Sequence, residues 1–223
     1  MDKLLVCDLD GTLLLTENHW IPTLEKLFQW VKSEYGISPA IQNSREPLQY
    51  LGIPSLEIFR KLFPGTDEHL LKEITLKEDH FFSEALREVT PKLYEGVEET
   101  LSHFKESGWK IYLSSNCGIF YKAQIVNRTS LRSMLDDEIC AGQYIPGKSK
   151  GEFTRFLIRE NIRKRKLKRE YSGFFAGDGA SDMAAGRLNQ LQTVWASYGY
   201  ANKPEESMID LTIERFSDLQ QLI

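Results

Sequence analysis

Short apolar runs recur along the chain, and each one ends at small or acidic residues. The runs are Leu4–Cys7, Ile111–Leu113, Phe174–Ala176 and Thr193–Ala196. Continuous apolar runs of this length are typical of strands that are buried on both faces of a sheet. We therefore predict a buried strand at each run.

Helical patterns separate these runs. Residues 96–108 and 152–162 carry apolar side chains at the spacing of one helix face. Strands that alternate with helices favour an α/β fold, a doubly wound, parallel, Rossmann-like sheet with helices on both faces. Such a sheet binds its ligand beyond the carboxyl ends of the strands. We therefore expect Asp8, Ser115 and Asp178, which follow three of the runs, to converge there.

One long block does not alternate. From Glu17 to Pro91 no strand-like run occurs, and helical patterns cover residues 20–35, 55–63 and 67–89. A helical block inserted after the first strand predicts a small cap domain over the crevice. We therefore divide the chain into an α/β catalytic core domain, residues 1–16 and 91–223, and an α-helical cap domain, residues 17–90.

Composition and charge exclude several classes of protein. The 223 residues are 41% hydrophobic, enough for a sizeable core, and the net charge of −4 offers no global basic field for nucleic acid. The basic run Arg159–Glu170 has no interleaved aromatic residue and is interpreted as a solvated helix end.

The N-terminal apolar run is too short for a signal peptide or a membrane span. Three scattered cysteines suit a reducing compartment, so we predict a cytoplasmic protein without nucleic-acid or membrane partners and leave its oligomeric state open.

The first run leads into Asp8-Leu9-Asp10-Gly11-Thr12. Residues i and i+2 of a strand face the same way, so Asp8 and Asp10 would both face the crevice if the strand continued. Two carboxylates this close repel each other, and a cation beside them would relieve the repulsion. Hard oxygen ligands select Mg²⁺. The alternative is an ordinary acidic turn at a strand end, in which Gly11 allows the sharp bend.

Two further polar stretches follow predicted strands. Ser115 and Asn116 would hold phosphate oxygens at a strand-to-helix junction, or else cap the next helix. Asp178 and Asp182, in Gly-Asp-Gly-Ala-Ser-Asp, would add carboxylates to a cation site, or else cap a helix in a glycine-rich turn.

Lys148 and Lys150 lie where the helix at residues 152–162 begins. A lysine at this point would neutralise a phosphoryl group, and the alternative is an exposed lysine. Each of these stretches is weak evidence alone. Their occurrence in order, each after a strand or at the start of a helix, favours one common site.

Together these stretches resemble the haloacid dehalogenase superfamily of phosphotransferases. The matching stretches are DLDGT at 8–12, Ser115-Asn116, KGE at 150–152 and GDGASD at 177–182. Residues 90–116 are also similar to the segment that follows the cap in phosphoglycolate-phosphatase-like members. The resemblance extends over the whole chain, and the helical insert corresponds to the cap of those members.

The resemblance implies catalytic and phosphate-binding roles. It implies that Asp8 attacks phosphorus and forms an aspartyl-phosphate, and that Asp10 protonates the leaving oxygen and later takes a proton from water. Ser115, the Asn116 amide and Lys150 would hold the phosphoryl oxygens. The KGE match favours Lys150, whereas the more frequent Lys-Pro form of this motif, absent here, would align on Lys148.

The resemblance also implies a metal site. Mg²⁺ would be held by the carboxylates of Asp8 and Asp178 and by the backbone carbonyl of Asp10, with support from Asp182. Leu15 departs from the pattern, because capped members commonly have an acid there.

The function implied is a Mg²⁺-dependent phosphatase for a small phosphomonoester, such as phosphoglycolate or a sugar phosphate. A phosphoglucomutase-like phosphotransferase keeps both acids and is the closest alternative. A dehalogenase needs no acid at the second position, so Asp10 argues against that branch. A phosphonoacetaldehyde-hydrolysing enzyme needs a cap lysine that forms a Schiff base, and nothing in the sequence indicates such a lysine. A non-catalytic phosphate-binding scaffold is the alternative from another class, and it would have no chemical need for the complete set of acids and Lys150.

Overall fold

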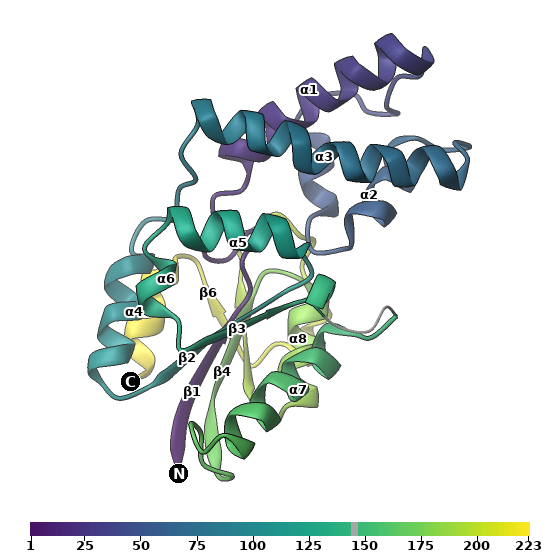
Figure 1. Cartoon of the computed structure of the whole chain (residues 1–223). Helices are drawn as coiled ribbons and strands as arrows, with labels where there is room; N and C mark the ends of the chain where they lie inside the picture. Colours follow the sequence, from purple (N-terminus) through teal and green to yellow (C-terminus); the bar gives the residue numbers. More distant parts are fainter. Residues whose placement is uncertain (144–146) are drawn as a thin grey trace.

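The computed structural model describes residues 1–143 and 147–223 of the chain. In these residues one parallel sheet has the strand order β3-β2-β1-β4-β5-β6. Its strands are β1 (Asp2–Cys7), β2 (Lys110–Ser115), β3 (Asp137–Cys140), β4 (Tyr171–Gly177), β5 (Gln192–Ala196) and β6 (Leu211–Ile213). The predicted doubly wound, Rossmann-like α/β fold is confirmed, with β1 at the centre of the sheet (Figure 1).

Every predicted apolar run lies within a strand, namely β1, β2, β4 or β5. The sequence analysis missed β3 and β6, which form the two edges of the sheet. These strands have four and three residues, and β3 begins with Asp137-Glu138. Short edge strands with polar positions carry no continuous apolar run, so the pattern that marks the inner strands is absent from them.

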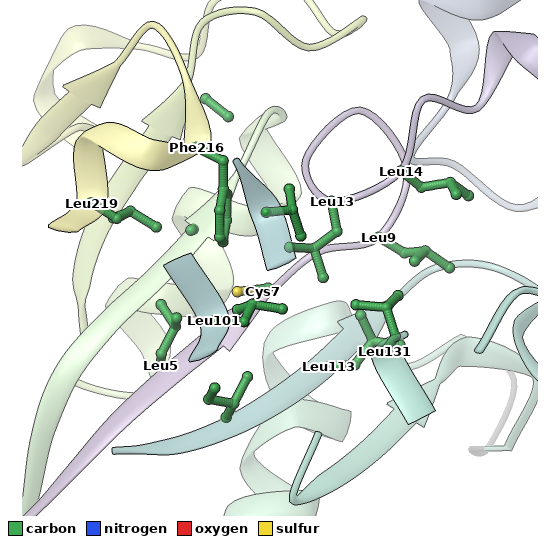
Figure 2. Packing of buried hydrophobic residues seen from close by; sticks show 14 of the residues in the cluster. Leu5, Cys7, Leu9, Leu13, Leu14, Leu101, Leu113, Leu131, Phe216 and Leu219 are labelled. Atoms are coloured by element: carbon green, nitrogen blue, oxygen red, sulfur yellow. The ribbon is translucent and has the colours of Figure 1, made fainter. Parts of the chain in front are cut away.

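Helices cover both faces of the sheet, which explains why β1 is apolar throughout its second half. Leu4 and Val6 join a cluster of buried side chains with the helices α7 (Lys150–Arg163) and α8 (Ala180–Leu188). Leu5 and Cys7 point to the other face. There they meet α4 (Val97–Glu106) and the 3-10 helix η4 (Phe216–Leu222), as Figure 2 shows for Leu101, Phe216 and Leu219.

Three helices between β1 and α4 form the cap: α1 (Glu17–Tyr35), α2 (Ser55–Leu62) and α3 (Glu68–Glu88). They share a buried cluster of their own, with Trp20, Phe59 and Ile74 among its members. Figure 1 shows them beyond the carboxyl ends of the strands, with α5 (Ile119–Arg128) between cap and sheet. All three lie within residues 17–90, the range predicted for the cap, and the domain boundaries themselves stay a prediction.

The remaining elements are short, namely α6 (Leu131–Met134) and the 3-10 helices η1 (Glu46–Tyr50), η2 (Ala141–Gln143) and η3 (Glu206–Met208). The basic run at 159–170 contains the last turn of α7 and the exposed loop that leads to β4, as interpreted from the sequence. No helix among the described residues is long and apolar enough to cross a membrane.

Candidate active site

Asp8 is the first residue after β1 and is 1% exposed. Its backbone N–H donates to the carbonyl oxygen of Ala176 on β4 at 2.9 Å, so the neighbouring strand fixes its position. The side-chain Oδ1 accepts a hydrogen bond from Lys150 Nζ at 2.6 Å, whereas the buried Oδ2 has no hydrogen-bond partner among the described residues. Burial and the nearby charge of Asp182 raise the pKa of Asp8, and Lys150 opposes this rise.

Asp10 lies beyond the strand, because β1 ends at Cys7 and the chain turns at Gly11 with a φ of 75°. The strand does not continue to Asp10, so Asp8 and Asp10 are not aligned along one strand as the sequence analysis considered. Asp10 Oδ1 instead accepts hydrogen bonds from Tyr121 Oη at 2.6 Å and from Thr16 Oγ1 at 2.8 Å. Burial raises the pKa of Asp10, and these two hydroxyl donors oppose the rise.

Asp178 and Asp182 follow β4 and lie beside Asp8. One carboxylate oxygen from each of the three acids lies within 4.8 Å of the others, and all three side chains are buried. Asp178 Oδ2 accepts from the backbone N–H groups of Tyr200 and Ala201 at 2.8 and 3.1 Å. Burial, then the charge of Asp182, raises the pKa of Asp178 to about 7 despite these two hydrogen bonds.

Asp182 has a structural role as well. The capping alternative placed an aspartate at the N-cap, but the N-cap of α8 is Gly179 and Asp182 is the third residue of the helix. Asp182 Oδ2 accepts from the Gly179 N–H at 2.9 Å, and its Oδ1 accepts from Lys150 at 2.6 Å. The same carboxylate therefore supports the first turn of α8 and joins the acid cluster.

Three glycines allow the backbone to approach the acids closely. A Cβ at Gly11 would lie 2.3 Å from Asp178 Oδ2, and one at Gly199 would lie 2.2 Å from the Asp178 Cβ. A Cβ at Gly177 would lie 2.3 Å from the Asp182 Cβ. Any side chain at these positions would displace a carboxylate of the cluster. The sequence analysis did not single out Gly199, which comes from the loop after β5.

Lys150 lies between Asp8 and Asp182 at the start of α7, and its side chain is buried. Burial alone would lower the pKa of Lys150, but the charges and hydrogen bonds of Asp182 and Asp8 raise it overall. Lys148 instead pairs with Glu152 at 2.9 Å on the exposed side of the helix. Of the two candidate lysines, the structure therefore brings only Lys150 to the acids.

Ser115 is the last residue of β2 and Asn116 follows it, and both line the same cavity as Asp8 and Asp10. Ser115 Oγ accepts from the Cys117 N–H at 3.3 Å, and Asn116 Nδ2 donates to the Gly52 carbonyl oxygen in the cap at 2.6 Å. The next helix, α5, has Gly118 at its N-cap and no capping side chain. The helix-capping alternative for Ser115 and Asn116 is therefore wrong.

A cavity of about 180 Å³ extends from these residues to the cap. The end of the cavity in the core is lined by Asp8, Asp10, Ser115 and Asn116. The end in the cap is lined by residues of α1, α2, α3 and the loop after η1. Sequence analysis missed Tyr121 and Thr16, which hold Asp10. Tyr121 carries no local signal, since it lies 111 residues from the acid that it contacts.

Comparison with known families agrees with this arrangement. The sequence model of the haloacid dehalogenase-like hydrolase family matches residues 5–196 of the chain. The chain belongs to this family. The matched range runs from β1 to β5 and includes every residue of the acid cluster, so the resemblance inferred from the four stretches is confirmed. No curated protein matches the sequence.

Solved structures share this haloacid dehalogenase-like fold over nearly the full length of the chain. A predicted phosphoglycolate phosphatase from Haemophilus somnus superposes with a TM-score of 0.79 at 19% identity, covering 99% of this chain and 97% of that one. A predicted phosphatase from Clostridium acetobutylicum gives 0.75 at 17% identity, covering 100% and 98%. CbbY from Rhodobacter sphaeroides, solved with phosphate, gives 0.71 at 16% identity, covering 98% and 96%. At these identities the likeness establishes the fold.

The acid cluster of this hydrolase fits a divalent cation. Lys150 pairs with two of the three buried carboxylates, Asp8 and Asp182, and like charges in a buried site require further positive charge. The buried Asp8 Oδ2 has no hydrogen-bond donor among the described residues, and such an oxygen suits a cation. Carboxylate oxygens are ligands that Mg²⁺ prefers.

Proposed function

We propose that the protein is a Mg²⁺-dependent phosphatase that hydrolyses a small phosphomonoester through an aspartyl-phosphate on Asp8. The observation that carries this proposal is the buried Asp8 carboxylate, which has one oxygen on Lys150 and the other without a hydrogen-bond partner. An oxygen without a donor keeps its lone pairs for electrophilic phosphorus or for a cation. Membership of the hydrolase family and the neighbours that are named as phosphatases support the same activity.

In the proposed first step, a carboxylate oxygen of Asp8 forms a bond to phosphorus while the bond from phosphorus to the leaving oxygen breaks. Asp10 gives its proton to that leaving oxygen, so the alcohol departs neutral. Tyr121 and Thr16 hold the Asp10 carboxyl in one orientation. Burial keeps the pKa of Asp10 above its usual range, which favours the protonated form needed for this step.

In the second step, water attacks the phosphorus of the aspartyl-phosphate and gives a proton to Asp10, and the bond between phosphorus and Asp8 breaks. Phosphate leaves and both carboxyls return to their starting states. Ser115, the Asn116 amide and Lys150 are proposed to bind the phosphoryl oxygens. Asp8, Asp178 and the Asp10 carbonyl, with Asp182 in support, would hold Mg²⁺, which supplies positive charge to the phosphoryl group.

The test is phosphate release from p-nitrophenyl phosphate by the purified chain with Mg²⁺. We expect turnover that excess chelator abolishes and that returns on adding Mg²⁺, with a loss of at least about a thousandfold in Asp8→Asn. Asp2→Asn, at the opposite end of β1, is the matched control and should keep activity. No turnover over a broad phosphomonoester panel, or full activity in Asp8→Asn, would overturn the proposal.

The role of Asp10 is tested by the leaving group. p-Nitrophenolate departs readily without a proton, whereas an alkoxide needs one. Asp10→Asn should therefore slow hydrolysis of an alkyl phosphate more than hydrolysis of p-nitrophenyl phosphate.

A phosphoglucomutase-like phosphotransferase would instead pass the phosphoryl group to a sugar phosphate. Transfer to a sugar phosphate at the same rate as release of phosphate would contradict simple hydrolysis.

A further inference from the structure

The cavity between core and cap has acids at both ends. At the core end lie Asp8 and Asp10, and at the cap end lie Glu78 and Asp79 of α3. We propose that this cavity selects phosphate esters whose leaving group carries a positively charged amine, and that Glu78 and Asp79 are the residues that select it. This inference rests on the proposed phosphatase function and adds to it the chemical class of the substrate.

Helical spacing directs these two acids to the cavity. Thr75, Glu78, Asp79 and Phe82 all line it, and they stand three, four and seven positions apart on α3. Residues at this spacing share one face of a helix. The acids therefore belong to the face of α3 that meets the cavity, and a leaving group attached to phosphorus at Asp8 would extend toward them.

Among the described residues that line the cavity there is no lysine, arginine or histidine. Two lysines elsewhere in the cap have acidic or aromatic partners of their own. Lys26 pairs with Glu84 and Glu88, and Lys77 lies 5.3 Å from the centre of the Trp30 ring. A carboxylate or second phosphate on the leaving group would thus meet the like charges of Glu78 and Asp79, with no cation among the described lining residues to offset them.

The apolar walls suit an ammonium group as well. Trp20 and Phe82 line the cavity, and their aromatic faces attract cations. Trp20 Nε1 donates to Glu78 Oε1 at 2.9 Å, which holds the Glu78 carboxylate in place. Burial raises the pKa of Glu78 to about 7. A positively charged ammonium group bound beside Glu78 would lower this pKa again and favour the ionised carboxylate.

The size of the cavity limits the leaving group. An apolar cavity of about 150 Å³ accommodates benzene, and this one, of about 180 Å³, also receives part of the phosphoryl group. A short amino alcohol fits these limits. O-Phosphoethanolamine, 2-hydroxyethyl phosphate and 2-phosphoglycolate have leaving groups of similar length that are positive, neutral and negative, so they isolate the effect of charge.

The experiment measures kcat/KM for these three esters with Mg²⁺. We expect O-phosphoethanolamine to exceed 2-phosphoglycolate by at least about tenfold, with the neutral ester between them. Glu78→Gln, and more strongly Glu78→Gln with Asp79→Asn, should reduce that ratio by about tenfold and change the neutral ester by less than about threefold. Glu88→Gln is the matched control, because Glu88 lies on the same helix but outside the cavity.

Each outcome decides the inference. A ratio of one or below in the native protein, or an unchanged ratio in both variants, would overturn the charge selection while leaving the phosphatase intact. An equal loss for all three esters in Glu78→Gln would assign this residue a structural role and would also overturn it. Absence of phosphate release from these esters and from p-nitrophenyl phosphate would overturn the proposed function itself, and the inference with it.

Discussion

The Tyr121 hydroxyl donates a hydrogen bond to Asp10 Oδ1 at 2.6 Å and lies 2.9 Å from His19 Nε2. A helix of the core, α5, thereby connects the acid after β1 to the first cap helix, α1. Both Tyr121 and Asp10 line the cavity. Tyr121 is thus a positioning residue, since it orients the proposed acid and base and contacts the cap at the same time.

Tyr121→Phe removes a donor to the Asp10 carboxylate. Because the Tyr121 hydroxyl stabilises the ionised Asp10 carboxylate, its loss should raise the pKa of Asp10 further. We expect kcat to fall by about tenfold and the limb of the pH–rate profile that reports Asp10 to move to higher pH.

The control is Tyr112→Phe, because the buried Tyr112 hydroxyl has no hydrogen-bond partner among the described residues and lies in the sheet core. This variant should keep the native pH–rate profile. A Tyr121→Phe profile that superposes on the native one would contradict the positioning role.

Lys150 and Lys148 form a second test. Lys150→Met leaves Asp8 and Asp182 without their shared ammonium group, so we expect kcat/KM to fall by at least about a hundredfold. Lys148→Met removes an exposed lysine that pairs with Glu152 away from the acids, so its kcat/KM should stay within about threefold of the native value. Steady-state kinetics with p-nitrophenyl phosphate measures both. Equal losses in the two variants would argue against Lys150 as the phosphate-binding lysine.

Gly199→Ala tests how tightly the acid cluster is packed. The new Cβ would lie 2.2 Å from the Asp178 Cβ, so Asp178 or the loop must move. We expect the Mg²⁺ concentration for half-maximal activity to rise by at least about tenfold and the free energy of unfolding to fall by about 1–3 kcal/mol. Gly179→Ala is the control, because its Cβ would meet Ala201 and Asp182 at an ordinary 3.5 Å. Native Mg²⁺ dependence in Gly199→Ala would refute the proposed contact.

His19 predicts a pH dependence of stability. Burial lowers the pKa of His19 to about 4, below the unfolded value of about 6.5. As pH falls between these values the unfolded chain binds a proton that the folded protein does not, so the free energy of unfolding falls with pH. Relative to His19→Gln, the native protein should lose about 2 kcal/mol between pH 7.5 and pH 5.

Urea unfolding of both proteins at the two pH values, in chelator, measures this difference. The comparison cancels the titration of groups common to both proteins. Parallel losses of stability in the native protein and in His19→Gln would show that His19 does not titrate as its burial predicts.

Much of the fold follows from local pattern. The inner strands appear as apolar runs because both of their faces are covered, and Leu4 to Cys7 alternate between two buried clusters. The cap helices follow from the spacing of apolar residues. Asp67 caps the N-terminus of α3, where its side chain accepts hydrogen bonds from the His69 and Leu70 N–H groups. The edge strands β3 and β6 do not follow from pattern, because short, partly exposed strands need neither continuous apolar residues nor alternation.

Some residues of the candidate site can likewise be identified from sequence, and others only from the structure. Asp8, Asp178 and Lys150 are identifiable from sequence, because each stands directly after a strand or at the start of a helix, and a parallel sheet brings such positions to one edge. The KGE match favoured Lys150 over Lys148, and the structure places Lys150, not Lys148, beside Asp8, because the direction of a side chain at a helix start depends on packing.

The sequence by itself determined the inner strands of the sheet, the cap helices and the acids that meet at the carboxyl edge, because hydrophobic spacing and strand-end chemistry are local properties. Only the tertiary structure decided what surrounds those acids: the Tyr121 donor, the Gly199 backbone and the Glu78 and Asp79 carboxylates across the cavity. These contacts join segments far apart in the chain. Their physical basis is close packing, both within the core and between core and cap, which no local pattern encodes.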